Sequence, residues 1–153
     1  MLESRMFVQN SLSPKTTLEL VVKAFDKHFE LHERVLPDEP TVVDALDGHW
    51  ARLTCDTMNI ESRFVMFIHE QLGFRPNLRI TFDAKNPEYE LGLIRFINSV
   101  ARDPNWSLAL TLHDSFVILV KRGLEIHVNE ELRGSSRLEL FRFPYEVRPI
   151  NRL

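Results

Sequence analysis

The sequence predicts an α+β fold, with a largely antiparallel sheet, a C-terminal β-meander and about three helices packed on one face. Three observations support this prediction. Apolar residues recur at helical spacing in three segments of the chain. Residues 78–83 alternate strictly between apolar and polar side chains, which is typical of a half-buried strand. Between residues 106 and 128, three apolar segments are separated by two short turns, as in a meander.

The first part of the chain combines two predicted strands with one long helix. Residues 5–9 form a short strand, and Ser13-Pro14 has the residue types that begin a helix. Apolar spacings of three and four extend this helix to about Glu33 and place His28 and His32 four residues apart on it. Residues 35–47 contain two prolines and are expected to form a loop, which a strand at residues 50–55 follows.

A second helix is predicted at residues 60–72. Asn59 can cap its beginning, and Gly73 stands where a left-handed residue commonly ends a helix. The spacing of apolar residues predicts that one stripe of this helix faces the core. The stripe consists of Ile60, Phe64, Phe67, Ile68 and Leu72.

A third helix follows the strand at residues 78–83. Asn86-Pro87 has the same cap-and-proline pattern as the first helix. The meander then occupies residues 106–112, 116–120 and 124–128, and residues 138–143 are expected to add a last strand. The predicted core face of the third helix consists of Tyr89, Leu93, Phe96, Ile97 and Val100.

Composition and length bound the class of protein. The 153 residues are about one domain's worth of chain, so we expect a single domain at 1–153. One cysteine excludes a disulfide framework. No apolar run approaches the roughly 20 residues of a membrane span, and the first ten residues lack the apolar core of a signal peptide. We therefore expect a cytoplasmic protein with no membrane partner.

Charge is unevenly distributed along the chain. The net charge of −3 disfavours nucleic-acid binding, while residues 26–47 hold seven acids against two bases. This segment is either a solvated face that pairs with the arginine-rich tail or a patch that binds a partner protein. Trp50 beside it is either an interface aromatic or a core tryptophan. The predicted partner-binding set is Glu30, Glu33, Asp38, Glu39, Asp44, Asp47 and Trp50.

The arginine-rich tail after residue 133 also contains Phe141, Phe143 and Tyr145. Arginines contact phosphates and aromatics stack on bases, so this tail has the residue types of a single-strand binder. The simpler interpretation is a strand or strap packed on the core, and we expect no nucleic-acid partner.

No constellation of residues in the sequence indicates catalysis. His28 and His32 are two possible ligands, whereas a structural zinc site usually has four. The consecutive residues His113-Asp114-Ser115 cannot adopt the geometry of a hydrolase triad, and a tight turn explains them. Cys55 lies in an apolar strand and is expected to be buried. The sequence therefore predicts no catalytic residues, no metal and no cofactor, although an enzyme with a site near His113 remains an alternative.

The middle of the chain resembles the Sit-type immunity proteins, which protect a cell from a toxin passed between neighbouring bacteria. The segment Glu70-Gln-Leu-Gly-Phe-Arg-Pro-Asn-Leu-Arg-Ile-Thr-Phe82 has that family's Leu-Gly-Phe-Arg-Pro strand entry. A helix follows it, and then Val117-Ile-Leu-Val-Lys-Arg-Gly-Leu-Glu-Ile-His-Val-Asn129 takes the place of the family's meander pattern. The match covers residues 60–131. The turn at residues 113–115 departs from the family's Asn-Gly-Glu, and the tail after Gly134 has no counterpart.

The resemblance implies a non-catalytic immunity protein that neutralises a cognate toxin by protein–protein occlusion. An acidic patch would suit a basic toxin such as a nuclease. A binding or scaffold protein of another class is the alternative, and either a monomer or a homodimer fits the sequence.

Overall fold

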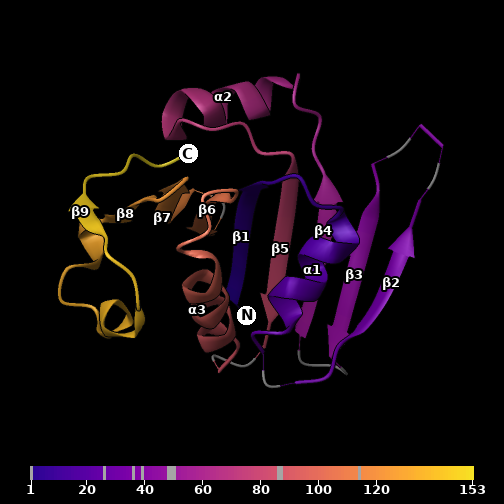
Figure 1. The fold of residues 1–153 in the computed structure, drawn as a ribbon, viewed down its shortest axis with the longest axis horizontal. Coiled ribbons are helices and arrows are strands. Elements are labelled where there is room, and N and C mark those ends of the chain that lie inside the picture. The colour runs from indigo at the N-terminus through magenta and orange to yellow at the C-terminus, as the bar shows by residue number, and fades with distance from the viewer. Residues whose placement is uncertain are drawn as a thin grey trace.

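The computed structural model describes residues 2–25, 27–35, 37–38, 40–47, 51–85, 88–113 and 115–153. Its strands form one sheet in the order β2-β3-β4-β5-β1-β6-β7-β8-β9 (Figure 1). All neighbouring strands are antiparallel except β8 and β9, so the predicted α+β class with a largely antiparallel sheet is confirmed. The strands are β1 (Leu2–Gln9), β2 (Glu30–Arg34), β3 (Val42–Asp47), β4 (Ala51–Thr57), β5 (Leu78–Ala84), β6 (Ser107–Leu112), β7 (Phe116–Arg122), β8 (Glu125–Asn129) and β9 (Glu146–Arg148).

The α-helices are α1 (Pro14–Val22), α2 (Arg63–Leu72) and α3 (Glu88–Val100). Helices α1 and α3 cover one face of the sheet and share a large apolar core with it (Figure 1). Helix α2 does not join them, because Ile68 and Leu72 pack with Phe7, Ala109 and other side chains of the opposite face. The expectation that all helices share one face is therefore wrong for α2. None of the helices in the described residues has the length and apolar composition of a membrane span.

The predicted helix signals hold at two helix ends and fail at a third. Ser13 caps α1, and its hydroxyl oxygen accepts a hydrogen bond from the Thr16 amide at 3.1 Å. Gly73 ends α2 in the left-handed conformation with φ of 85°. The cap at the start of α2 is Ser62 rather than Asn59, because the Ser62 hydroxyl oxygen accepts from the Val65 amide at 3.2 Å.

The first helix is shorter than its apolar spacing predicts. It ends at Val22, where the amides of Ala24 and Phe25 turn back to the carbonyls of Val21 and Val22. The chain then becomes extended, so residues 30–34 form β2 instead of the last helical turns. Phe25 and Phe29 still reach the core, as their spacing requires, but from a loop. Tertiary strand pairing overrides local helix preference here.

The loop expected at residues 35–47 contains a strand. Residues 42–47 form β3, which pairs with β2 on one side and β4 on the other. Val43 and Ala45 face the core and are fully buried, which is the alternation of a half-buried strand. Pro37 and Pro40 affect only the connection between β2 and β3.

The second half of the chain matches its prediction more closely. Strand β5 alternates between buried and half-buried residues, and all five predicted core residues of α3 are buried. Strands β6, β7 and β8 form the antiparallel meander. The strand expected at 138–143 is wrong, because Ser136–Leu140 is a 3-10 helix and the last strand is β9. Phe141 and Phe143 are buried, which confirms the strap interpretation of the tail.

Lys121 is a fully buried charged residue on β7 that the sequence does not reveal. Its Nζ donates hydrogen bonds to the carbonyl oxygens of Asp103, Trp106 and Gly123 at 2.6, 2.5 and 2.5 Å. Burial lowers the pKa of Lys121, and the nearby charge of Asp103 opposes that effect. The side chain thus fastens β7 to the turn after α3 and to the β7–β8 turn.

Gly92 allows a close contact between α3 and the loop after α1. A Cβ atom at this position would lie 2.2 Å from two ring carbons of Phe25. The Phe25 ring is surrounded by Phe29, Phe82 and Tyr89 at centroid distances of 5.7, 5.7 and 6.0 Å. The ring therefore has little room to move, and glycine is required for packing rather than for backbone conformation.

Candidate protein-binding face

The sheet surface opposite α1 and α3 is polar on strands β2, β3, β4, β5 and β1, and we call it the outer face. Alternation along each strand sends one set of side chains into the α1–α3 core and the other set to this surface. The outer face is therefore built by residues far apart in sequence. Its charged members are Glu3, Arg5, Glu30, His32, Arg34, Asp44, Arg52, Asp56, Arg79 and Asp83.

Asp44 is the best-connected acid of the outer face. Its Oδ1 accepts hydrogen bonds from the Arg52 guanidinium at 3.1 Å and from the Thr54 hydroxyl at 2.8 Å. Its Oδ2 lies 3.9 Å from Nη2 of Arg34. The Asp44 side chain is only 13% exposed, and arginines of β2 and β4 offset its charge.

Opposite charges also pair elsewhere on this surface. Nη2 of Arg79 donates to Asp56 Oδ2 at 2.7 Å across β4 and β5, and Nη2 of Arg5 donates to Glu3 Oε1 at 3.2 Å along β1. The outer face thus carries interspersed charges of both signs. Such a surface recognises a partner with a complementary pattern better than it attracts a uniformly basic one.

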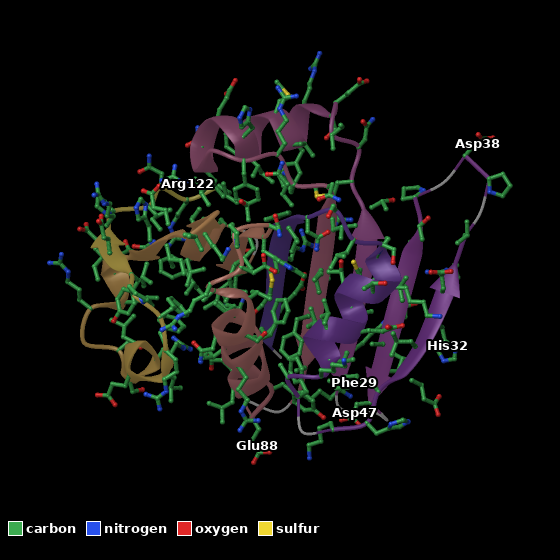
Figure 2. The ribbon with its side chains drawn as sticks, in the orientation of Figure 1. Phe29, His32, Asp38, Asp47, Glu88 and Arg122 are labelled. Carbon is green, nitrogen blue, oxygen red and sulfur yellow. The ribbon has the colours of Figure 1, made fainter. Side chains whose placement is uncertain are left out.

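The predicted acidic set is divided between different surfaces. Glu30 and Asp44 lie on the outer face, whereas Glu33 and Asp47 have the opposite strand parity. Asp38 lies at the tip of the β2–β3 hairpin, far from Asp47 at the other end of β3 (Figure 2). Glu39 and Trp50 lie outside the described residues. The structure therefore does not bring the described members together as one acidic patch, because the strand pleat and arginines from distant strands separate them.

Asp47 has a structural partner on the core side of the sheet. Its Oδ2 accepts a hydrogen bond from the Tyr89 hydroxyl of α3. Burial and this hydrogen bond to Asp47 raise the pKa of Tyr89 to about 12. Cys55 on β4 is fully buried, as predicted, and burial with the nearby Asp56 charge raises its pKa to about 12.

The raised pKa values of Cys55 and Tyr89 predict that the folded protein loses stability at alkaline pH. Both folded pKa values lie above the ordinary values of 9.0 for Cys55 and 10.0 for Tyr89. Their contribution is therefore complete below pH 9 and is lost as the pH rises toward 12, because only the unfolded chain can readily ionise them. Urea unfolding across this range should show a fall in the free energy of unfolding that is shallower in Cys55→Ala and in Tyr89→Phe. An unchanged slope in both variants would contradict the prediction, whatever their absolute stability.

Helix α2 carries exposed apolar side chains next to the outer face. Phe64 and Phe67 of this helix are 42% and 39% exposed, and Ile60, just before the helix, is 49% exposed; we call these three residues the α2 apolar surface. The expectation that they belong to the core is wrong, because Val65 joins Ile68 and Leu72 on the buried side. The Phe64 ring contacts the Phe7 ring edge-on at 5.5 Å, and Phe7 pairs with Arg79 in the sheet. The α2 apolar surface is therefore continuous with the outer face.

The histidines noted in the sequence do not form a metal or catalytic site together. His28 precedes β2 and His32 lies on β2, so the helical spacing expected for them is absent. His113 is exposed in the β6–β7 turn with φ of 50°, and Asp114 lies outside the described residues. Within the described ranges, no three side chains of metal-binding type cluster.

A polar cluster that the sequence does not indicate lies beside α2. His127 Nε2 is 2.8 Å from Glu125 Oε1, and His127 Nδ1 is 3.4 Å from Nη2 of Arg122. Arg122 and His127 line a hollow of about 160 Å³ (Figure 2 labels Arg122). The Arg122 side chain also lies against Gly73, since a Cβ there would be 2.9 Å from Arg122 Nη1. This cluster connects β7 and β8 to the end of α2, which gives it a structural role.

Together, the fold and the outer face define an α+β protein with one polar sheet surface bordered by exposed aromatics. No protein-family model matches the chain. No curated protein matches its sequence either.

Proposed function

We propose that this protein is an immunity-type binding protein that neutralises a toxin by covering it, with the outer face and the α2 apolar surface as the contact region. The observation that carries the proposal is the exposure of Phe64 and Phe67 on α2 and of Ile60 just before this helix. Large apolar side chains that gather at the surface commonly mark protein-interaction sites, and aromatics are frequent binding hot spots.

The charged part of the outer face supports the same proposal. Its paired arginines and carboxylates border the apolar contact on the side of the sheet, as the polar rim of an interface borders its centre. Glu30 and Asp38 add exposed acids at opposite ends of the β2–β3 hairpin. The sequence resemblance to Sit-type immunity proteins, which begins at Ile60, includes α2 itself. Occlusion of this kind needs a rigid surface and no reactive group.

Growth protection tests the proposed function. A susceptible bacterium that produces the polypeptide encoded by the adjacent reading frame should stop growing, and growth should resume when this chain is produced with it. The purified pair should form a complex by titration calorimetry. A toxic neighbour that this chain neither binds nor counteracts would refute the proposal.

Phe67→Ser is expected to weaken that complex by about tenfold or more, because the truncation removes an aromatic contact from the centre of the interface. The matched control is Leu91→Ser, since Leu91 is 41% exposed and lies on α3, which covers the other face. The control should bind like the wild type. Equal affinities for the two variants by titration calorimetry would remove α2 from the binding region.

A further inference from the structure

Strand β2 ends the sheet on one side, and its outer edge has no strand neighbour in the described part of the chain (Figure 1). An edge strand presents backbone N–H and C=O groups that can pair with another strand. The opposite end of the sheet is formed by β9, which has three residues. The β2 edge is thus the longer site for strand addition.

The alternation of backbone hydrogen bonds along β3 shows which residues of β2 direct their N–H and C=O groups toward the free edge of the sheet. The Thr57 amide donates to the Thr41 carbonyl at 3.1 Å, so Thr41 faces β4 and the next residue, Val42, faces β2. The partners of Val42, Asp44 and Leu46 are Arg34, His32 and Glu30, whose backbone groups therefore point toward β3. Leu31 and Glu33 alternate with them, and their N–H and C=O groups point away from the sheet.

We propose that β2 pairs with β2 of a second copy of this chain, antiparallel about a two-fold axis at His32, to make one continuous sheet. Outward residues can pair only with outward residues, so the axis must pass through a residue position. At His32 the pairing sets Leu31 opposite Glu33 of the second copy, with their backbone groups hydrogen-bonded. The same register sets Glu30 of each copy opposite Arg34 of the other copy, so this pair forms twice.

The charges select this register over its neighbours. An axis at Glu33 would place two Glu33 side chains opposite each other and Arg34 opposite His32. An axis at Leu31 would place Glu33 opposite the buried Phe29. Only the axis at His32 brings a glutamate opposite an arginine, since the axis at Leu31 places Glu30 opposite His32; cross-strand pairs of opposite charge stabilise a sheet, whereas like charges destabilise it. Figure 2 shows His32 at the free side of β2.

Apolar residues at the two ends of β2 fit the same register. Val35 is 65% exposed, and the pairing would place it opposite Phe29 of the second copy. Phe29 is 7% exposed and contacts the Phe25 ring in the core, so Val35 would extend that core across the interface. The arginine and glutamate involved have only weak internal partners, since Arg34 lies 3.9 Å from Asp44 and Glu30 lies 3.9 Å from His32.

The test is the oligomeric state of the full chain and of two charge-reversal variants. Sedimentation at concentrations about a hundredfold apart should show a wild-type dimer that dissociates on dilution. In a Glu30→Arg dimer an arginine would face an arginine at both ends of the paired β2 strands, and in an Arg34→Glu dimer a glutamate would face a glutamate. The dissociation constant of each variant dimer should therefore rise about tenfold or more. A mixture of the two variants restores opposite charges at both ends and should form heterodimers as readily as the wild type dimerises.

The mixing experiment also serves as the folding control, because misfolded variants would not recover association. A wild-type chain that stays monomeric at both concentrations would overturn the proposal. A dimer that neither reversal weakens would also overturn it, since that dimer would use another surface such as the outer face.

Discussion

Replacing Lys121 with methionine is expected to lower the free energy of unfolding by about 3–5 kcal/mol. Methionine has a similar length but cannot donate a hydrogen bond, so the carbonyls of Asp103, Trp106 and Gly123 would lose their shared donor. An unsatisfied buried carbonyl costs more than an average hydrogen bond contributes, because its desolvation is no longer offset. The β7–β8 turn and the segment after α3 should loosen together.

Urea unfolding and hydrogen exchange would measure this effect. Lys15→Met is the matched control, since Lys15 is exposed on the first turn of α1. The control should stay within about 0.5 kcal/mol of the wild type. A Lys121→Met protein as stable as this control would show that water replaces the ammonium group at little cost.

Gly92→Ala should also destabilise the protein strongly, by about 2–3 kcal/mol, although alanine usually stabilises a helix relative to glycine by about 1 kcal/mol. The new methyl group would overlap the Phe25 ring, which Phe29, Phe82 and Tyr89 hold in place. Either the ring or α3 must shift, and both lie in the core.

A double-mutant cycle separates this clash from other effects. Phe25→Ala alone should cost about 3–5 kcal/mol through the cavity it leaves. In that background Gly92→Ala should become neutral or stabilising, because the overlap has been removed and the helix preference remains. Additive losses in the chemical-denaturation measurements would mean that the two residues do not oppose each other.

The sequence predicts the elements whose local pattern agrees with their tertiary surroundings. Strand β5, the core face of α3 and the meander all follow from apolar periodicity, because the same faces are buried in the fold. The region between Val22 and Asp47 fails for the opposite reason. Phe25 and Phe29 have helical spacing, yet both enter the core from the loop between α1 and β2, and β2 forms through its pairing with β3. The spacing of apolar residues along one segment does not show which other segment will pair with it.

The candidate binding face is predictable only in part. The polar alternation of β5 indicates in advance that Arg79 and Asp83 lie on a solvated face. The neutralisation of Asp44 by Arg52 could not be anticipated, because it depends on which strands are neighbours. The exposure of Phe64 and Phe67 has a similar origin, since no second α-helix in the described residues packs on this side of the sheet and only the face of α2 with Val65, Ile68 and Leu72 is buried.

The position of β1 has a consequence for biosynthesis. This strand is synthesised well before its two neighbours, because β5 begins at Leu78 and β6 at Ser107. Met6, Phe7 and Val8 of β1 therefore stay without their sheet neighbours until β5 and β6 have been synthesised. Pairing over such sequence distances slows folding, so the nascent chain is expected to depend on chaperones that bind β1 during synthesis.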